Sequence, residues 1–529
     1  MARCPPQSAR GSLTTGSALG LTAALTSKAM TSGRLQLAPV WRRQSSAGIY
    51  PGRVRSRLRR ALERGNRPRQ AAPNTSSEET SLVVDIAKFV LPACGLVAAN
   101  QLMTAVDKGF VGRISSLQLA AMGAAATSFD CISYVTTFIN TGCLSLLGAA
   151  LAVGDESEVN KVRSHALVFA GGLGSFFGVL LGLFAIPVCR GLGGAPEGAM
   201  LSAAVGYLTL RALGAPIERL ISLGTTFCLA TKDGATPLVV TALGSIANFV
   251  FDWAFCKHFP GHAASAAAAA SVVAALLSFT YLFRELRRSK RWPRPLVWPG
   301  FSDFGPFADF AGPVFLLLIV KSLTFTQMTA YASGLGTQIA AAHQIYVSLF
   351  FLTAVAVGTP LSWAAQTFMP GYLVKHHAGD QEAKTTHQQH RGPKFCLRAL
   401  LTVAVSCSAI AGTVVLLALE LGPTVFTTDP RVVAMLQAPS SVVPLLMFVS
   451  AYPIFIALEG TLIAARKLRL PLALSSMLFG FNALMFHLLG GCGLLGLDTL
   501  WTASATSLVI STASSALVTA RVCDRLARS

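Results

Sequence analysis

The sequence predicts an all-α membrane protein with about twelve transmembrane helices in two homologous six-helix lobes. Charged residues make up only 12% of the 529 residues and hydrophobic residues make up 53%, whereas a soluble protein has about 25% charged residues. Long apolar stretches recur along the chain, and short motifs of the first half return in the same order in the second half. Few charges and long apolar stretches together place the chain in a lipid bilayer.

Each apolar stretch is long enough for a helix that crosses a bilayer, which needs about 20 residues. Helices satisfy their own backbone polar groups in lipid, whereas the strands of a membrane barrel would be about half as long. Six stretches precede a polar break at 284–300 and six follow it: 82–107, 117–153, 164–189, 199–230, 236–256, 263–283, 306–333, 339–373, 395–419, 437–463, 470–491 and 497–520.

These stretches predict five parts of the chain. They are a basic N-terminal segment (1–78), a first lobe (79–283), a basic inter-lobe loop (284–302), a second lobe (303–522) and a C-terminal tail (523–529).

The positive charges support this division. When the gaps between stretches are assigned alternately to two sides, twenty Lys and Arg residues fall on one side. Five fall on the other side: Lys108, Arg113, Arg190, Lys257 and Arg431. The basic side faces the cytosol or, in a plastid, the stroma, so we expect both ends of the helical region there.

Internal repeats relate the two halves. The matching segments are 119–123 and 339–343, 154–155 and 379–380, and 229–232 and 463–466, followed by Asn248 and Asn482. Their offsets grow slowly from 220 to 225 to 234 residues. Six helices per half give both halves the same orientation, so we expect the substrate path between them.

The N-terminal segment has the composition of an organellar transit peptide. Residues 1–70 contain 14 Lys and Arg and one acid, Glu63, and so carry +13 of the net charge of +20. A mildly apolar stretch at 16–26 leaves open a preceding secretory signal, and a disordered tail that is never cleaved is the alternative. Nucleic acid is not an expected partner, because the segment has no periodic core and only Trp41 and Tyr50 for base stacking.

Five groups of motifs follow one another over residues 82–520. They are 107–112 with 115–123, 207–216, 232–237 with 248–252, 340–344 with 360–370, and 458–466. As a set they resemble the MATE (multidrug and toxic compound extrusion) family, and its plant plastid branch in particular.

The resemblance implies two lobes around a central cleft and a secondary antiporter that works by alternating access. Such a protein would export small organic solutes in exchange for H⁺ or Na⁺, without a further cofactor. It would lie in the chloroplast envelope as a monomer, with its termini on the stromal side. An exporter of organic cations or xenobiotics and a flippase for lipid-linked substrates are the alternatives. The sequence has no H-E-x-x-H, G-x-S-x-G or P-loop motif, so an enzyme is not expected.

Ionisable residues inside the apolar stretches are candidate site residues, because a charge at membrane depth is costly. Asn248 and Asp252 are four residues apart and so share one helix face. In the family, the positions that match these two residues and Asp107 form a polar cluster linked to proton binding. We expect Asp107 and Asp252 to couple the ion and Asn248 to orient Asp252.

Lys321 is a single cation in the seventh stretch, and no acid lies between Asp309 and Gly334. We expect Glu459 of the tenth stretch to be its resting partner. The pair is either permanent and structural, or a switch that an organic or aromatic anion opens by competing for Lys321. Tyr207 is a further candidate for the substrate path, with packing as the alternative.

Four further polar residues are expected to be structural. Asp130 and Arg211 are placed to pair between the second and fourth helices. His343 and Gln344, in the eighth, are expected to hydrogen-bond between helices.

Overall fold

The computed structural model describes residues 75–191, 198–378, 392–422 and 429–528, and every regular element within them is a helix. The chain divides into two units, Met1–Ala71 and Ala72–Ser529, and the described residues all belong to the second unit. Most of the predicted N-terminal segment (1–78) lies outside the described residues.

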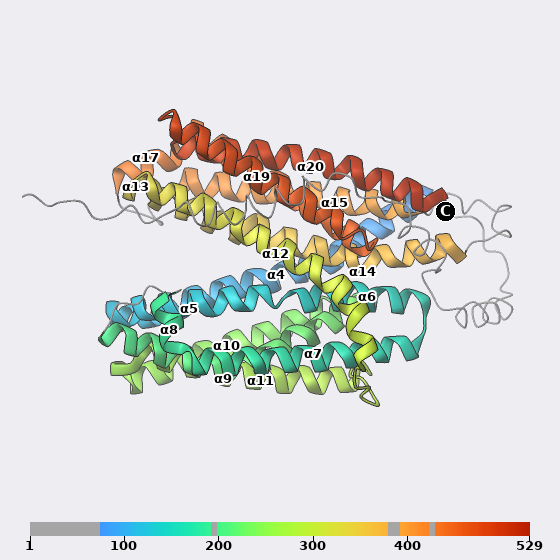
Figure 1. The fold of residues 1–529 in the computed structure, drawn as a ribbon, viewed down its shortest axis with the longest axis horizontal. Coiled ribbons are helices and arrows are strands. Elements are labelled where there is room, and N and C mark those ends of the chain that lie inside the picture. The colour runs from blue at the N-terminus through green and yellow to red at the C-terminus, as the bar shows by residue number, and fades with distance from the viewer. Residues whose placement is uncertain (1–74, 192–197, 379–391, 423–428, 529) are drawn as a thin grey trace, which may run out of the picture. The chain divides into compact units, whose positions relative to one another are not determined.

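The first lobe is built around one central helix, α9. This helix packs against α5, α7 and α11, and α10 packs against α4 and α11 (Figure 1). The lobe consists of α4 (Thr75–Ile114), α5 (Ser116–Val135), α6 (Phe138–Val153), α7 (Glu156–Leu183), α8 (Ala185–Gly191), α9 (Ala199–Ala230), α10 (Ala235–His258), η1 (Pro260–His262) and α11 (Ala263–Arg288).

The second lobe is built in the same way around α18. This helix packs against α14, α15 and α20, and α12 packs against α19 (Figure 1). The lobe consists of α12 (Phe301–Gly334), α13 (Thr337–Phe350), the π-helical turn η2 (Phe351–Val355), α14 (Ala356–Ala378), α15 (Pro393–Leu421), α17 (Pro430–Gln437), α18 (Pro439–Ala464), α19 (Arg469–Gly491) and α20 (Leu497–Arg528).

Eleven helices of the described residues are long and apolar enough to cross a bilayer, with α13, η2 and α14 counted as one. The remaining predicted span, 117–153, is divided into α5 and α6 at Thr136 and Thr137. The all-α membrane fold with about twelve spans is therefore confirmed, with the second helix of the first lobe broken.

The two lobes contact each other through α14, which packs against α4 and α6, and through α15, which packs against α4. We call the ends of the lobes that carry the predicted basic loops the inner ends, and the opposite ends the outer ends. One buried apolar cluster combines residues of both lobes, and most of its members lie toward the inner ends of their helices. We call this cluster the inner seal. It includes Ile86 and Phe89 of α4, Leu144 and Leu147 of α6, Leu361 and Phe368 of α14, and Leu400 of α15.

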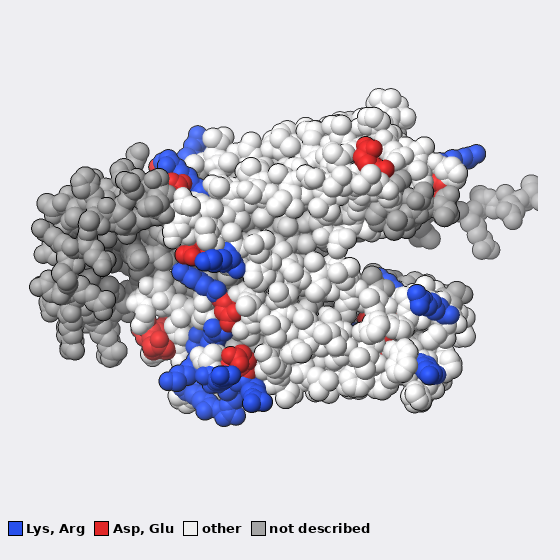
Figure 2. All heavy atoms as spheres, turned by 180° about the vertical axis from the view of Figure 1, so that it is seen from behind, with Lys and Arg blue, Asp and Glu red and all other residues white. Residues whose placement is uncertain are grey.

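Toward the outer ends, each lobe has an apolar core of its own. One such cluster contains only first-lobe residues and another only second-lobe residues. Figure 2 shows a cleft between the lobes at the end opposite to the one where most Lys and Arg side chains gather. The structure is therefore closed at the basic, inner side and open at the outer side.

Candidate functional site

A buried polar cluster lies in the outer half of the first lobe. The amide nitrogen Nδ2 of Asn248 donates hydrogen bonds to Oδ1 of Asp107 at 2.6 Å and to Oδ2 of Asp252 at 2.8 Å. Asn248 and Asp252 lie on α10 and Asp107 lies on α4. Their exposed fractions are 1%, 0% and 8%. The structure thus brings together the three residues that the sequence placed in one site.

The cluster has more hydrogen-bond acceptors than donors. Asn248 has two N–H donors, and both are used on the carboxyl groups. Asn248 Oδ1 and Asp252 Oδ1 have no hydrogen-bond partner among the described residues. Two carboxylates that share one amide repel each other and are unfavourable in a buried setting. The arrangement therefore favours the binding of a proton or of a small cation, either of which would supply the missing positive charge.

The second charged site links two helices of the second lobe. Lys321 Nζ on α12 lies 2.7 Å from Glu459 Oε1 on α18. The side chains are 17% and 6% exposed, so the lysine is the more accessible partner. Glu459 Oε2 has no hydrogen-bond partner among the described residues. The structure brings together the pair expected from the sequence, and each charge has one described ionic partner.

No direct ion pair joins Asp130 and Arg211 among the described residues, so their expected pairing stays a prediction. Arg211 instead forms a two-point ion pair with Glu218 of the same helix, α9, with Nη1–Oε1 at 2.6 Å and Nη2–Oε2 at 3.4 Å. The Arg211 guanidinium also lies over the ring of Phe129, 4.4 Å from its centroid. Residues seven apart return to nearly the same helix face, so Glu218 can reach Arg211 without a second helix. Asp130 is exposed.

The remaining expected site residues are Tyr207, His343 and Gln344. Tyr207 is buried in the apolar core of the first lobe, a position that fits the packing alternative. His343 Nε2 lies 3.2 Å from Oγ1 of Thr329, which connects α13 with α12 as expected. Gln344 is exposed.

Arg219 has a structural role that the sequence did not reveal. Its Nη1 donates to the carbonyl of Ser133 at 3.2 Å and to Oγ1 of Thr136 at 2.9 Å. Both acceptors lie where α5 ends and α6 has not begun. Arg219 therefore stabilises the break in the second helix by binding a carbonyl that the helix leaves free.

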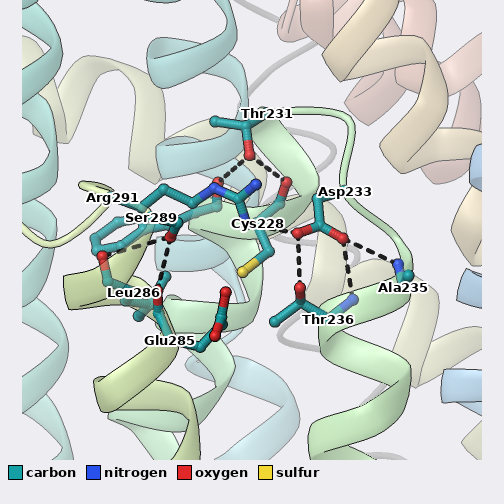
Figure 3. A network of polar contacts seen from close by, with 10 residues as sticks. Cys228, Thr231, Asp233, Ala235, Thr236, Glu285, Leu286, Ser289 and Arg291 are labelled. Atoms are coloured by element: carbon teal, nitrogen blue, oxygen red, sulfur yellow. Dashed lines mark hydrogen bonds and ion pairs between the residues drawn. The ribbon is translucent and has the colours of Figure 1, made fainter.

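A polar network at the inner end of the first lobe was also missed (Figure 3). Asp233, between α9 and α10, accepts hydrogen bonds from the amide nitrogens of Ala235 and Thr236 and from the Thr236 hydroxyl. It also pairs with Arg291 of the inter-lobe loop, with Oδ2–Nη1 at 2.5 Å. Burial alone would raise the pKa of Asp233, but these hydrogen bonds and the Arg291 charge outweigh it and hold the pKa below its ordinary value. Burial alone would lower the pKa of Arg291, but the bond to Asp233 outweighs it and raises that pKa.

Comparison with known proteins places these sites in a family context. The MatE family model matches residues 92–254. "Protein DETOXIFICATION 47, chloroplastic" of Arabidopsis thaliana is 27% identical over 422 residues, which are 78% of this chain and 74% of that protein. "Protein DETOXIFICATION 44, chloroplastic" of the same plant is 24% identical over 66% of each chain.

The fold is similar to that of solved MATE structures. A mutant of the Vibrio cholerae MATE transporter VcmN superposes with a TM-score of 0.74 at 16% sequence identity. The match covers 86% of this chain and 100% of that chain. At this identity the likeness shows the shared fold of two helical lobes.

Proposed function

Because the chain belongs to the MATE family of membrane transporters, we propose that it is a secondary antiporter. It exports small organic solutes in exchange for H⁺ or Na⁺ by alternating access. The observation that carries this proposal is the buried cluster of Asp107, Asn248 and Asp252.

The cluster is suited to couple an ion gradient to a conformational change. An ion drives such a change only if it binds the outward-open and inward-open states with different affinities. In the present outward-open state, the two carboxyl groups share one amide, and two acceptor atoms are left without donors. Ion binding removes the repulsion between the carboxylates. The free-energy difference between alternative arrangements of α4 and α10 therefore depends on whether the ion is bound.

Lys321 supports an organic anion as the exported solute. It is paired only with Glu459 among the described residues and is the more exposed of the two. A carboxylate in the cleft would compete with Glu459 for the ammonium group. An organic cation is the second candidate, because Oε2 of the buried Glu459 has no described partner and would be its binding atom.

The proposed location is the chloroplast envelope. Two Arabidopsis relatives carry the word chloroplastic in their names, and the N-terminal segment has the composition of a transit peptide.

The coupling proposal is tested by Asp252→Asn in reconstituted vesicles. We expect this variant to insert into the membrane and to lose solute uptake driven by a pH gradient, because the amide cannot be protonated in place of the carboxylate. Uptake is measured with a panel of labelled organic anions and cations, with either a pH or a Na⁺ gradient imposed. The gradient that drives the wild type identifies the coupling ion.

Asp498→Asn is the matched control, because Asp498 is an acid on α20 of the other lobe. We expect it to keep wild-type uptake. Wild-type gradient dependence in Asp252→Asn would remove Asp252 from the coupling site and with it the main support for the proposal.

A further inference from the structure

Among the described residues, two hydrogen bonds cross the inner seal from one lobe to the other. Oγ1 of Thr367 on α14 donates to the carbonyl of Leu229 on α9 at 3.2 Å. Oγ of Ser145 on α6 donates to the carbonyl of Ile463 on α18 at 3.5 Å, and this longer bond is the weaker of the two. Ser145 is 1% and Thr367 is 6% exposed. Both bonds are therefore shielded from water while the lobes are closed at this end.

The two bonds occupy equivalent positions in the internal repeat. Leu229 and Ile463 are the first residues of the repeated segments 229–232 and 463–466, at an offset of 234 residues. Ser145 and Thr367 are 222 residues apart, between the offsets of 220 and 225 that flank them in the repeat. In each case the second helix of one lobe donates a hydroxyl to the end of the fourth helix of the other lobe.

Both acceptor carbonyls lie in a final helical turn, where carbonyls lack an intrahelical partner. Leu229 accepts one hydrogen bond from the Lys232 amide and Ile463 accepts one from the Arg466 amide, each at 2.9 Å. Lys232 and Arg466 have φ angles of 63° and 56°, which end both helices in the left-handed conformation. Each carbonyl oxygen has a second lone pair, which is free for the hydroxyl of the opposite lobe.

The donors differ from other hydroxyls in the same region. Thr226 and Thr461 are buried, and each donates to the carbonyl four residues earlier in its own helix, at 3.0 Å. That is the usual bond of a threonine within a helix. Thr367 and Ser145 point across the interface instead.

The surrounding contacts keep the lobes close at these bonds. A side chain at Gly148 of α6 would place its Cβ 2.8 Å from the carbonyl oxygen of Gln366, so only glycine allows α14 to approach. The Phe368 ring lies 5.8 Å from the Phe89 ring and 4.6 Å from the Lys232 ammonium group, both of the first lobe.

We propose that Thr367 and Ser145 form a two-point latch that holds the lobes together at the inner seal in the outward-open state. We call this closed contact of the two lobes at the inner seal the inner gate. Opening toward the inner side requires both bonds to break together, because the repeat places them on the two sides of one interface. The latch assigns Thr367 and Ser145 as positioning residues in the proposed alternating-access cycle. Its role in transport rests on that proposed function.

The latch is tested by spin-label distance measurements across the inner ends, without substrate or ion gradient. Labels are placed at Glu158→Cys on the first lobe and Lys467→Cys on the second lobe, both exposed inner positions, in a cysteine-free full-length chain. Ser145→Ala and Thr367→Val are each expected to lower the ratio of closed to open inner gates about twofold to tenfold, as expected for loss of one neutral hydrogen bond. The double variant should show the largest shift toward long distances.

Thr226→Val and Thr461→Val are the matched controls, because they remove buried hydroxyls that do not cross the interface. Thr367→Ser keeps the hydroxyl and should keep the closed distribution. An unchanged distribution in the double variant, or an equal shift in the controls, would overturn the latch. Should the double variant not fold, Thr367→Val, which removes the shorter of the two bonds, gives the same decision. A shift in this assay supports the latch even if Asp252→Asn retains coupling, so the two proposals can fail separately.

Discussion

The energy of the Lys321–Glu459 pair decides whether it is a permanent contact or a switch. Removing one partner of a buried pair costs about 3–5 kcal/mol, because the other charge is left without compensation. Lys321 is 17% exposed and so retains access to a ligand, whereas Glu459 is 6% exposed. A ligand carboxylate that takes the place of Glu459 at Lys321 leaves Glu459 unpaired, so its own contacts would have to compensate most of that cost.

We expect Lys321→Met to abolish anion uptake, because the carboxylate of the solute loses its only proposed ionic partner. Lys321→Met combined with Glu459→Gln should recover the amount of folded protein, since no buried charge is left unpaired, but not the uptake. Uptake into vesicles and the fraction of monodisperse protein in detergent are the two measurements. Normal anion uptake by the double variant would show that the pair is structural. Loss of cation uptake in Glu459→Gln alone would favour an organic-cation exporter.

Spacing along a helix explains which site residues the sequence could predict. Asn248 and Asp252 share a face at four-residue spacing, and they contact each other in the structure. The Glu218 partner of Arg211 was not predicted, because seven-residue spacing places the two on one helix face but does not by itself indicate a contact. Ser145 and Thr367 carry no motif, and only the structure shows that they cross between lobes.

At the scale of elements, the second helix of each lobe is interrupted near its middle. In the first lobe, the Thr136 and Thr137 hydroxyls donate to the carbonyls of Ser133 and Tyr134, three residues earlier. Such bonds compete with the regular helix. In the second lobe the interruption is the π-helical turn η2, in which the Thr353 hydroxyl donates to Leu349. An apolar stretch predicts that a helix spans 117–153, but apolarity does not reveal such local hydrogen bonds.

The loop between α9 and α10 offers a test of how the inter-lobe loop is anchored. Asp233→Asn should lower stability at pH 7 by about 1–2 kcal/mol, because the charged hydrogen bond to Arg291 is lost. Asp233→Ala should lower it further, because asparagine still accepts the amide bonds at the start of α10 and alanine does not. Thermal unfolding in detergent compares these variants with the wild type.

The pH dependence of this pair has a defined sign. The folded-state pKa of Asp233 is depressed below its ordinary value, which is about 3.9 in an unfolded chain. Its contribution is therefore fully present above that value and is lost as the pH falls through the lower folded-state pKa. The stability difference between wild type and Asp233→Asn should be constant from pH 7 to about pH 5 and should shrink below about pH 4. A difference that stays constant at low pH would show that Asp233 does not act through its charge.

At the scale of the whole molecule, the repeat is chemically asymmetric. At the offset of 220 residues Gln327 takes the place of Asp107, and at 234 residues Asn482 and Phe486 take the places of Asn248 and Asp252. The second lobe therefore keeps the amide of the ion cluster without its carboxyl groups. In this lobe Asn482 accepts a hydrogen bond from Ser507 at 2.7 Å. The duplicated architecture thus serves one proposed ion site, whereas the gate hydroxyls are present in both halves.

The distribution of charge predicts two properties of the whole chain. The basic inner ends predict its orientation in the membrane, and the Arg-rich N-terminal segment predicts its location. The inner ends carry most of the Lys and Arg (Figure 2), so we expect them to face the stroma once the protein is in a plastid envelope. The N-terminal segment, most of which lies outside the described residues, would then be an import signal. Residues 1–70 fused to a fluorescent reporter should direct it into plastids, because the segment is rich in Arg and nearly free of acid. The matched control replaces Arg53, Arg55, Arg57, Arg59 and Arg60 by Glu, which should leave the reporter in the cytosol. A wild-type fusion that stays cytosolic or enters mitochondria would contradict the plastid location. The orientation of the inner ends is a separate question, and labelling of Glu158→Cys in intact organelles checks it.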